Sequence, residues 1–203
     1  MYKRQGIDIS SFWNSIYCYD NDGKLIDFNW DENIEKKIYN FESKILTCCE
    51  NRHGLFILTE DMHIFQNLSS SLDGEDIFEF QMIANFDSEL SQEKQYCKMT
   101  SYHEDFLLIS IGTFFVLFGI CEAKADMIDL GEVVRNFEIS ESLNQGVLLL
   151  GNSAVVISLE QNKIIKKIEF GSKMKALALI DNFVVVGGFN KKVIQFKLDK
   201  ARK

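Results

Sequence analysis

The chain has 203 residues, of which 46% are apolar and 26% are charged, and its formal net charge at pH 7 is -8. This length and composition fall in the ordinary globular range, which excludes a chain too short or too polar to bury a core. The absence of proline and the 17 phenylalanines, together with many Ile and Val residues, favour strands and predict an all-β fold.

Five segments repeat one plan along the chain: an apolar strand, a short turn, and a second strand in which apolar and polar residues alternate. They lie at 15–30, 54–68, 105–120, 146–160 and 182–198. Each segment predicts a β-hairpin. Two more strand-like runs precede each of the last two hairpins, at 126–131 and 134–140 and then at 163–170 and 173–180, so each repeat offers four strands.

The repeat has a regular period. Its turns lie near Asp22, Asp61, Thr113, Ser153 and Asn190, which gives spacings of 39, 52, 40 and 37 residues. A four-stranded propeller blade takes about 40 to 45 residues. The long second interval contains the polar run SSSLDGED at 69–76, which we interpret as an insertion between outer strands.

This periodicity and hairpin form resemble the WD-repeat family of β-propellers over essentially the whole chain. The family's Gly-His and Trp-Asp dipeptides are absent, and only Leu198-Asp199 keeps the aspartate in the dipeptide position. The resemblance implies one domain of four-stranded blades, with units at approximately 5–41, 42–90, 91–131, 132–170 and 171–203. If 6–11 is the first innermost strand, the fifth unit has three strands. We therefore expect an open or incomplete ring of four to five blades, either a fragment of a larger propeller or one completed by a partner.

The cysteine pattern predicts free thiols. There are five cysteines, at Cys18, Cys48, Cys49, Cys97 and Cys121, without regular spacing and without an apolar leader before them. A reducing compartment, cytoplasmic or nuclear, is the simpler interpretation. The sixteen uncharged residues from Phe106 to Cys121 are shorter than the roughly 20 needed for a membrane helix. They predict two buried strands around a turn.

Two groups combine cysteine with histidine, the residue types of zinc sites and of catalytic dyads. Cys48 and Cys49 with His53 lack the spacing of a zinc site, and neighbouring strand residues point to opposite faces, so buried strand cysteines are expected. Cys97 with His103 has no identifiable orienting acid and predicts a core cysteine and a turn histidine rather than a catalytic dyad. No metal or cofactor site is predicted.

Two glycine-containing segments predict turns. The run Asp20-Asn21-Asp22-Gly23 fails the EF-hand pattern and fits a hairpin turn. Gly187-Gly188 has no phosphate-binding pattern around it and is also expected in a tight turn.

Charge is distributed unevenly. Residues 161–203 hold eleven Lys and Arg against three acids, a balance of +8, which leaves -16 on residues 1–160. The lysines gathered within one and a half repeats are Lys166, Lys167, Lys173, Lys175, Lys191, Lys192 and Lys197. They predict a solvated basic face, and the alternative is a contact for nucleic acid, an anionic lipid or an acidic protein segment.

The resemblance implies a non-catalytic protein–protein interaction scaffold, a subunit or adaptor of a larger eukaryotic complex, with no cofactor. The alternative is a propeller enzyme or small-ligand binder with a site in the central channel. Such a site requires acids, histidines or metal ligands at equivalent ends of several innermost strands. The expected innermost strands carry mostly apolar and small residues, which favours the scaffold.

Overall fold

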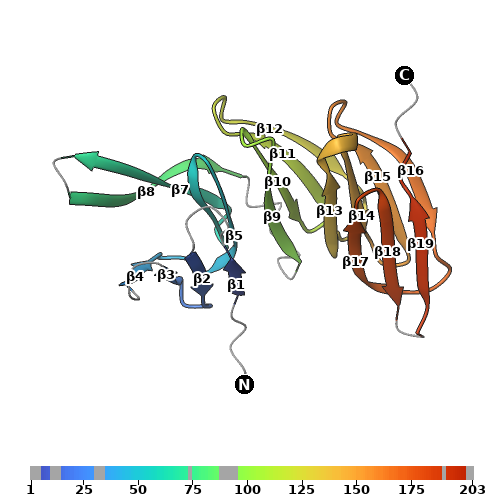
Figure 1. The fold of residues 1–203 in the computed structure, drawn as a ribbon, viewed down its shortest axis with the longest axis horizontal. Helices are drawn as coiled ribbons and strands as arrows, with labels where there is room; N and C mark the ends of the chain where they lie inside the picture. The colour runs from blue at the N-terminus through green and yellow to red at the C-terminus, as the bar shows by residue number, and fades with distance from the viewer. Residues whose placement is uncertain are drawn as a thin grey trace.

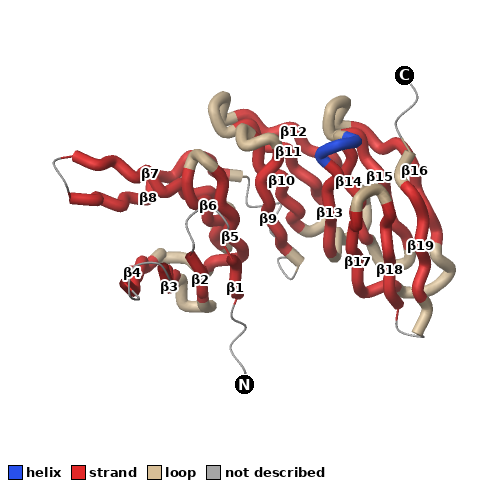
Figure 2. Tube along the Cα trace, viewed as in Figure 1, coloured by secondary structure: helices blue, strands red, loops and turns tan. Residues whose placement is uncertain are grey.

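The computed structural model describes residues 6–9, 15–29, 35–72, 75–86, 96–188 and 191–199. These residues form nineteen strands and no α-helix, and one short 3₁₀ turn, η2 (Glu141–Leu143), interrupts the strand pattern (Figure 2). The chain is therefore all-β, as predicted. Within the same residues, no helix has the length and apolar character needed to cross a membrane.

The strands form five antiparallel sheets, each built from strands that follow one another in the chain. The first sheet contains β1 (Gly6–Ile9), β2 (Ser15–Tyr19), β3 (Lys24–Asn29) and β4 (Glu35–Asn40). The second contains β5 (Ile45–Asn51), β6 (Gly54–Thr59), β7 (His63–Leu72) and β8 (Glu75–Asn85). The third contains β9 (Cys97–Tyr102), β10 (Phe106–Ile111), β11 (Phe114–Gly119) and β12 (Lys124–Asp129).

The fourth sheet contains β13 (Asn136–Ser140), β14 (Gln145–Leu149), β15 (Ser153–Ser158) and β16 (Lys163–Glu169). The fifth has three described strands, β17 (Met174–Ile180), β18 (Phe183–Gly188) and β19 (Val193–Lys197). Figure 1 shows the sheets following one another in an arc, from β1–β4 at the left to β17–β19 at the right. This is the arrangement of propeller blades.

All five predicted hairpins are confirmed, because each forms the second and third strands of a sheet. The apolar run from Phe106 to Cys121 is one of them: β10 and β11 pair from Phe106 with Gly119 to Ile111 with Phe114. Its centre is a turn rather than part of a membrane helix.

The first hairpin shows how the sequence specifies a turn. The Asp20 carboxylate accepts hydrogen bonds from the backbone amides of Asp22 (2.9 Å) and Lys24 (3.1 Å). Gly23 has φ +79°, and a Cβ there would lie 2.4 Å from the carbonyl oxygen of Phe41. Only glycine fits this close approach, so the predicted hairpin turn is confirmed.

The core consists of four apolar clusters, one between each pair of neighbouring sheets. The cluster between the second and third sheets includes Phe56, Leu58, Leu107 and Phe118, and equivalent clusters fill the other three spaces. Because successive side chains of a strand point to opposite faces of the sheet, neighbouring residues of one strand belong to different clusters. Cys48 packs toward the first sheet and Cys49 toward the third, as predicted for strand cysteines. No disulfide joins any of the five cysteines.

The ring is not closed. Among the described residues, no strand of the fifth sheet pairs with the first sheet, and β19 lacks a strand on its outer edge. Four sheets thus have four strands and the fifth has three, as expected from the repeat count. In the part of the chain that the structure describes, no sixth sheet packs on the outer face of the fifth sheet, whereas the next sheet covers the equivalent face of each preceding sheet.

One local prediction was wrong, that of a turn at Gly187 and Gly188. The polar run at 69–76, predicted as an insertion between outer strands, lies where β7 leads into β8. Its described residues extend both strands, which pair from His63 with Asn85 to Leu72 with Glu75. The long pairing shows that a polar strand forms when its partner continues beside it. Gly187 and Gly188 lie in β18 and pair with Ala176 and Met174, so they end a strand instead of forming the turn.

Candidate functional site

The seven lysines of the C-terminal region do not form one continuous patch. Lys166 and Lys167 lie on β16, the outer strand of the fourth sheet, and Lys175 lies on β17. Lys197 lies at the end of β19 that pairs with Phe183, and its ammonium is 5.7 Å from the Phe183 ring centroid. All seven side chains are exposed.

Three of the lysines are neighbours at one end of the fifth sheet. Lys191 and Lys192 lie just before β19, and Lys173 lies just before β17. Their backbones meet around Gly188, whose amide donates to the Lys192 carbonyl at 2.8 Å and which pairs with Met174. The Lys192 ammonium donates to the Phe170 carbonyl at 2.8 Å. We name this group, Lys173, Lys191 and Lys192, the basic corner.

Lys167 is already neutralised within the chain. Its ammonium pairs with Glu132 at 3.1 Å and with Glu169 at 3.2 Å. Hydrogen bonds to these carboxylates raise the pKa of the Lys167 ammonium. The site predicted from sequence therefore reduces mainly to the basic corner.

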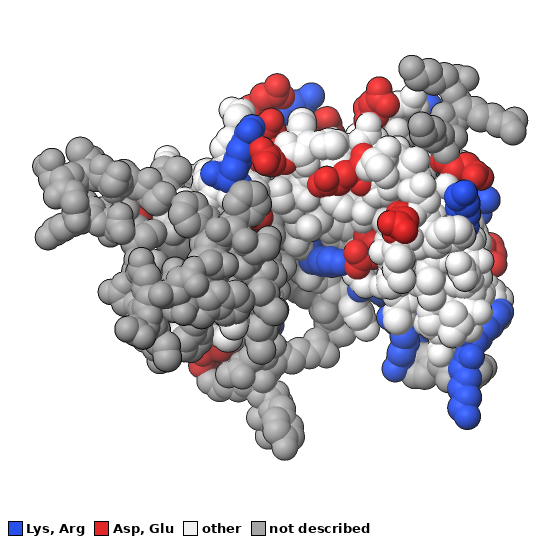
Figure 3. All heavy atoms as spheres, in the orientation of Figure 1, with Lys and Arg blue, Asp and Glu red and all other residues white. Residues whose placement is uncertain are grey.

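The opposite edge of the arc carries acidic turns. Figure 3 shows carboxylates gathered along the upper edge, whereas long basic side chains project at the lower right, below the fifth sheet. A cleft of about 500 Å³ opens near the ends of β5 and β9 and is lined by Glu50, Asn51, Ser101, His103, Glu104 and Glu141. These residues come from three successive sheets. The cleft thus offers carboxylates to a cationic group.

An ion-pair network borders this cleft. Arg52 pairs with Glu104 at 2.8 Å and with Asp105 at 2.7 Å, and His53 Nε2 lies 3.0 Å from Asp105 Oδ1. Hydrogen bonds from His53 and Arg52 hold the pKa of the Asp105 carboxyl below its usual value. Asp105 is therefore ionised at neutral pH.

Cys97 and His103 do not form a dyad. Cys97 begins the six-residue strand β9 and His103 directly follows it, so they lie about 20 Å apart for an extended chain. Burial raises the pKa of the Cys97 thiol to about 12, which opposes thiolate formation. His103 contacts Asn144 Oδ1 at 3.1 Å in the next sheet. Cys97 is partly buried against the core cluster between the second and third sheets, and His103 lies in a turn, as predicted.

Large apolar side chains are exposed on the outer face of the fifth sheet. Ile180 is 64% exposed, Phe183 42% and Val193 68%. Ile180 pairs with Phe183, while Val184 and Val186, which alternate with Phe183, point into the cluster shared with the fourth sheet. We name Ile180, Phe183 and Val193 the open face. The sequence pattern of these strands could not show which of their apolar residues the fold leaves exposed.

No protein-family model and no curated protein matches the chain. Solved structures match its fold. The computationally designed protein Ika8 gives a TM-score of 0.69 at 12% identity, over 95% of this chain and 57% of its own. The WD40 β-propeller domain of Doa1 gives 0.67 at 12% identity, over 97% of this chain and 67% of its own.

The β-propeller domain of Myceliophteria thermophila Cps50 (Swd1) gives a TM-score of 0.66 at 11% identity, over 100% of this chain and 71% of its own. The chain thus spans 57 to 71% of the lengths of these three structures. At such identities the likeness shows the fold alone. That fold is a WD40-like β-propeller with a divergent sequence and an open ring.

Proposed function

We propose that this chain is a non-catalytic protein-interaction scaffold, a WD-repeat-like subunit or adaptor of a larger eukaryotic complex in the cytoplasm or nucleus. The open face carries the proposal. In each preceding sheet, the equivalent side is covered by the next sheet. The five units together act as one domain. A protein partner of matching apolar surface is the occupant that this face favours.

Burial explains why such a face favours binding. Covering apolar surface contributes about 25 cal/mol per Å², and exposed contiguous apolar patches commonly mark interaction sites. The third and fourth sheets show the covered state, since Phe115 and Phe137 from the two sheets pack edge to face with ring centroids 5.2 Å apart. Phe183 has no such neighbour from a following sheet among the described residues.

Aspartate substitutions on the open face test the proposal. We expect Ile180→Asp and Val193→Asp to remove the proteins that the full chain captures stoichiometrically from eukaryotic cytosol. Ile164→Asp is the matched control, because Ile164 is 48% exposed on β16 but lies outside the open face. Equal capture by all variants would contradict the proposal.

The basic corner would add electrostatic steering toward an acidic segment of the same partner. The double charge reversal Lys191→Glu and Lys192→Glu should slow association, with a smaller effect at high salt because of screening. An unchanged association rate at low salt would show that the corner is only solvated.

Nucleic acid is the second candidate partner, favoured by the local excess of lysine at this corner. Phosphate contacts would make the logarithm of affinity fall linearly with the logarithm of salt concentration. Titration of a labelled duplex at several salt concentrations separates this candidate from the protein partner. A flat dependence excludes phosphate contacts.

A further inference from the structure

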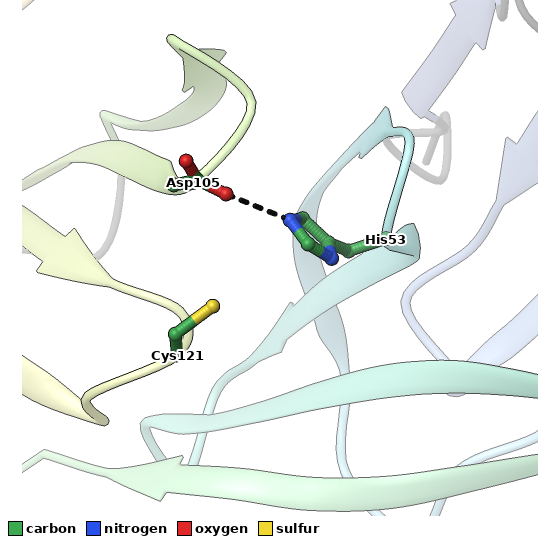
Figure 4. A group of neighbouring side chains, drawn as sticks. All are labelled: His53, Asp105 and Cys121. Carbon is green, nitrogen blue, oxygen red and sulfur yellow. Dashed lines mark hydrogen bonds and ion pairs between the residues drawn. The ribbon is translucent and has the colours of Figure 1, made fainter.

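Three turns of two neighbouring sheets bring His53, Asp105 and Cys121 together. His53 lies between β5 and β6, Asp105 between β9 and β10, and Cys121 between β11 and β12. One imidazole nitrogen, one carboxylate oxygen and the thiol sulfur all lie within 4.8 Å of one another. Figure 4 shows the Cys121 sulfur directed toward the other two side chains. The sequence gives no sign of this group because 52 residues separate His53 from Asp105.

The backbone around His53 is fixed. The amide of His53 donates to the side-chain oxygen of Asn51 at 2.8 Å, and its carbonyl accepts from the Gln66 side chain at 2.8 Å. Asn51 is buried, and its amide group donates to Ser101 Oγ and to the Glu104 carbonyl of the third sheet. His53 is therefore held against the turn that carries Asp105.

Asp105 and Cys121 are held together in the same way. The Asp105 carbonyl accepts the backbone amide of Ile120 at 2.9 Å, which fixes the residue directly before Cys121. Hence the three turns are positioned by hydrogen bonds that do not use the imidazole, carboxylate or thiol groups. Fixing ligand positions beforehand lowers the ordering cost of binding.

The chemistry of the three groups selects zinc. Neutral imidazole, thiolate and carboxylate are the zinc ligands of proteins, with metal–ligand distances of about 2.0 to 2.3 Å. A tetrahedral site of this kind places its ligand atoms roughly 3.3 to 3.7 Å apart. His53 Nε2 and Asp105 Oδ1 are 3.0 Å apart, and the sulfur is within 4.8 Å, so small side-chain rotations suffice. Magnesium and calcium prefer oxygen ligands throughout.

Arg52 opposes the metal. Its Nη2 contacts Asp105 Oδ1, and its Nε is 3.3 Å from His53 Nε2. Arg52 also pairs through Nη1 with Glu104, and both side chains are about half exposed. Rotation of Arg52 would thus free Asp105 and His53 while its pair with Glu104 is kept.

We propose that His53, Asp105 and Cys121 form a zinc-binding site that joins the second and third sheets at the acidic edge, with water as the fourth ligand. On binding, the Cys121 thiol releases its proton to solvent, and the Arg52 guanidinium moves away from Asp105. The inference is independent of the proposed scaffold function.

Cobalt substitution provides the test. The full chain, stripped with a chelator and kept reduced, should take up one Co²⁺ with a thiolate-to-metal charge-transfer band, which Zn²⁺ then displaces. Cys121→Ser should abolish the band, and His53→Gln and Asp105→Asn should each weaken Zn²⁺ binding at least about tenfold. Cys18→Ser and His103→Gln are the matched controls, since neither residue belongs to the group, and both should leave binding unchanged.

Arg52→Gln sharpens the test, because removal of the competing cation should tighten Zn²⁺ binding severalfold. The circular dichroism spectrum of each variant checks that the sheets are intact. The proposal is overturned if wild type and Arg52→Gln both lack a stoichiometric band. It is also overturned if the band persists in Cys121→Ser.

Discussion

The fourth and fifth sheets have similar apolar strands but differ in what covers them. Every residue of β14 and β15 is buried, because the third sheet packs on one face and the fifth on the other. In β18, Val184 and Val186 are buried, whereas Phe183 is exposed. The exposure of the fifth sheet therefore comes from its place at the end of the arc. An end sheet with the apolar pattern of an inner sheet is suited to receive a neighbour.

The largest effect expected from this difference concerns two phenylalanines. Phe137 is fully buried between the third and fourth sheets, and Phe183 belongs to the open face. Phe137→Ala should lower the free energy of unfolding by about 3 to 5 kcal/mol, and Phe183→Ala by less than about 1 kcal/mol. Urea denaturation measures both. Similar losses would mean that the open face is covered in the isolated chain.

A smaller effect is expected at a polar contact between inner sheets. The Lys98 ammonium on β9 donates to the Phe137 carbonyl at 2.7 Å and to Asn136 and Glu138, both at 3.0 Å, on β13. Lys98→Met should cost about 1 to 2 kcal/mol of unfolding free energy, since the side chain is partly exposed. Lys163→Met, on the exposed outer strand β16, is the control and should change stability by less than about 0.5 kcal/mol. Equal losses would show that Lys98 does not join the sheets.

The smallest effect is expected in the turn between β6 and β7 of the second sheet. Burial alone would raise the pKa of Asp61, but the Thr59 hydroxyl and the nearby His63 lower it below the usual value. A lowered pKa in the folded state stabilises the protein above about pH 4 and loses that contribution as the pH falls further. Asp61→Asn should therefore cost about 0.5 to 1 kcal/mol at pH 7, discounted for exposure, and progressively less as the pH falls below about 4. Thermal unfolding of both proteins across this pH range measures the loss. A loss that is the same at every pH would contradict a lowered pKa of Asp61.

The sequence predicted the fold to the level of individual hairpins, because alternation and turn residues such as Asp20 and Gly23 act locally. It failed at Gly187 and Gly188, which are strand residues because β17 pairs with them. The polar residues at 69–72, predicted as part of an insertion between outer strands, form a strand because β8 continues beside them. Neither outcome depends on the local pattern alone.

The candidate sites were less predictable than the fold. His53, Asp105 and Cys121 meet only after the second and third sheets pack, and the cleft lined by Glu50, His103 and Glu104 has the same origin. Aligning the turn positions of the repeats could have grouped His53, Asp105 and Cys121 from the sequence. The same alignment of turn positions would have separated the basic corner from Lys197, which lies at the other end of the β18–β19 hairpin.

Covalent footprinting of side chains tests the open face most directly. In the free chain, we expect a diffusible carbene or hydroxyl radical to label Ile180, Phe183 and Val193 strongly and to leave Val184 and Val186 nearly unlabelled. The same three residues should become protected when a partner binds. Protection of Ile180, Phe183 and Val193 in the free, monomeric chain would contradict an open arc.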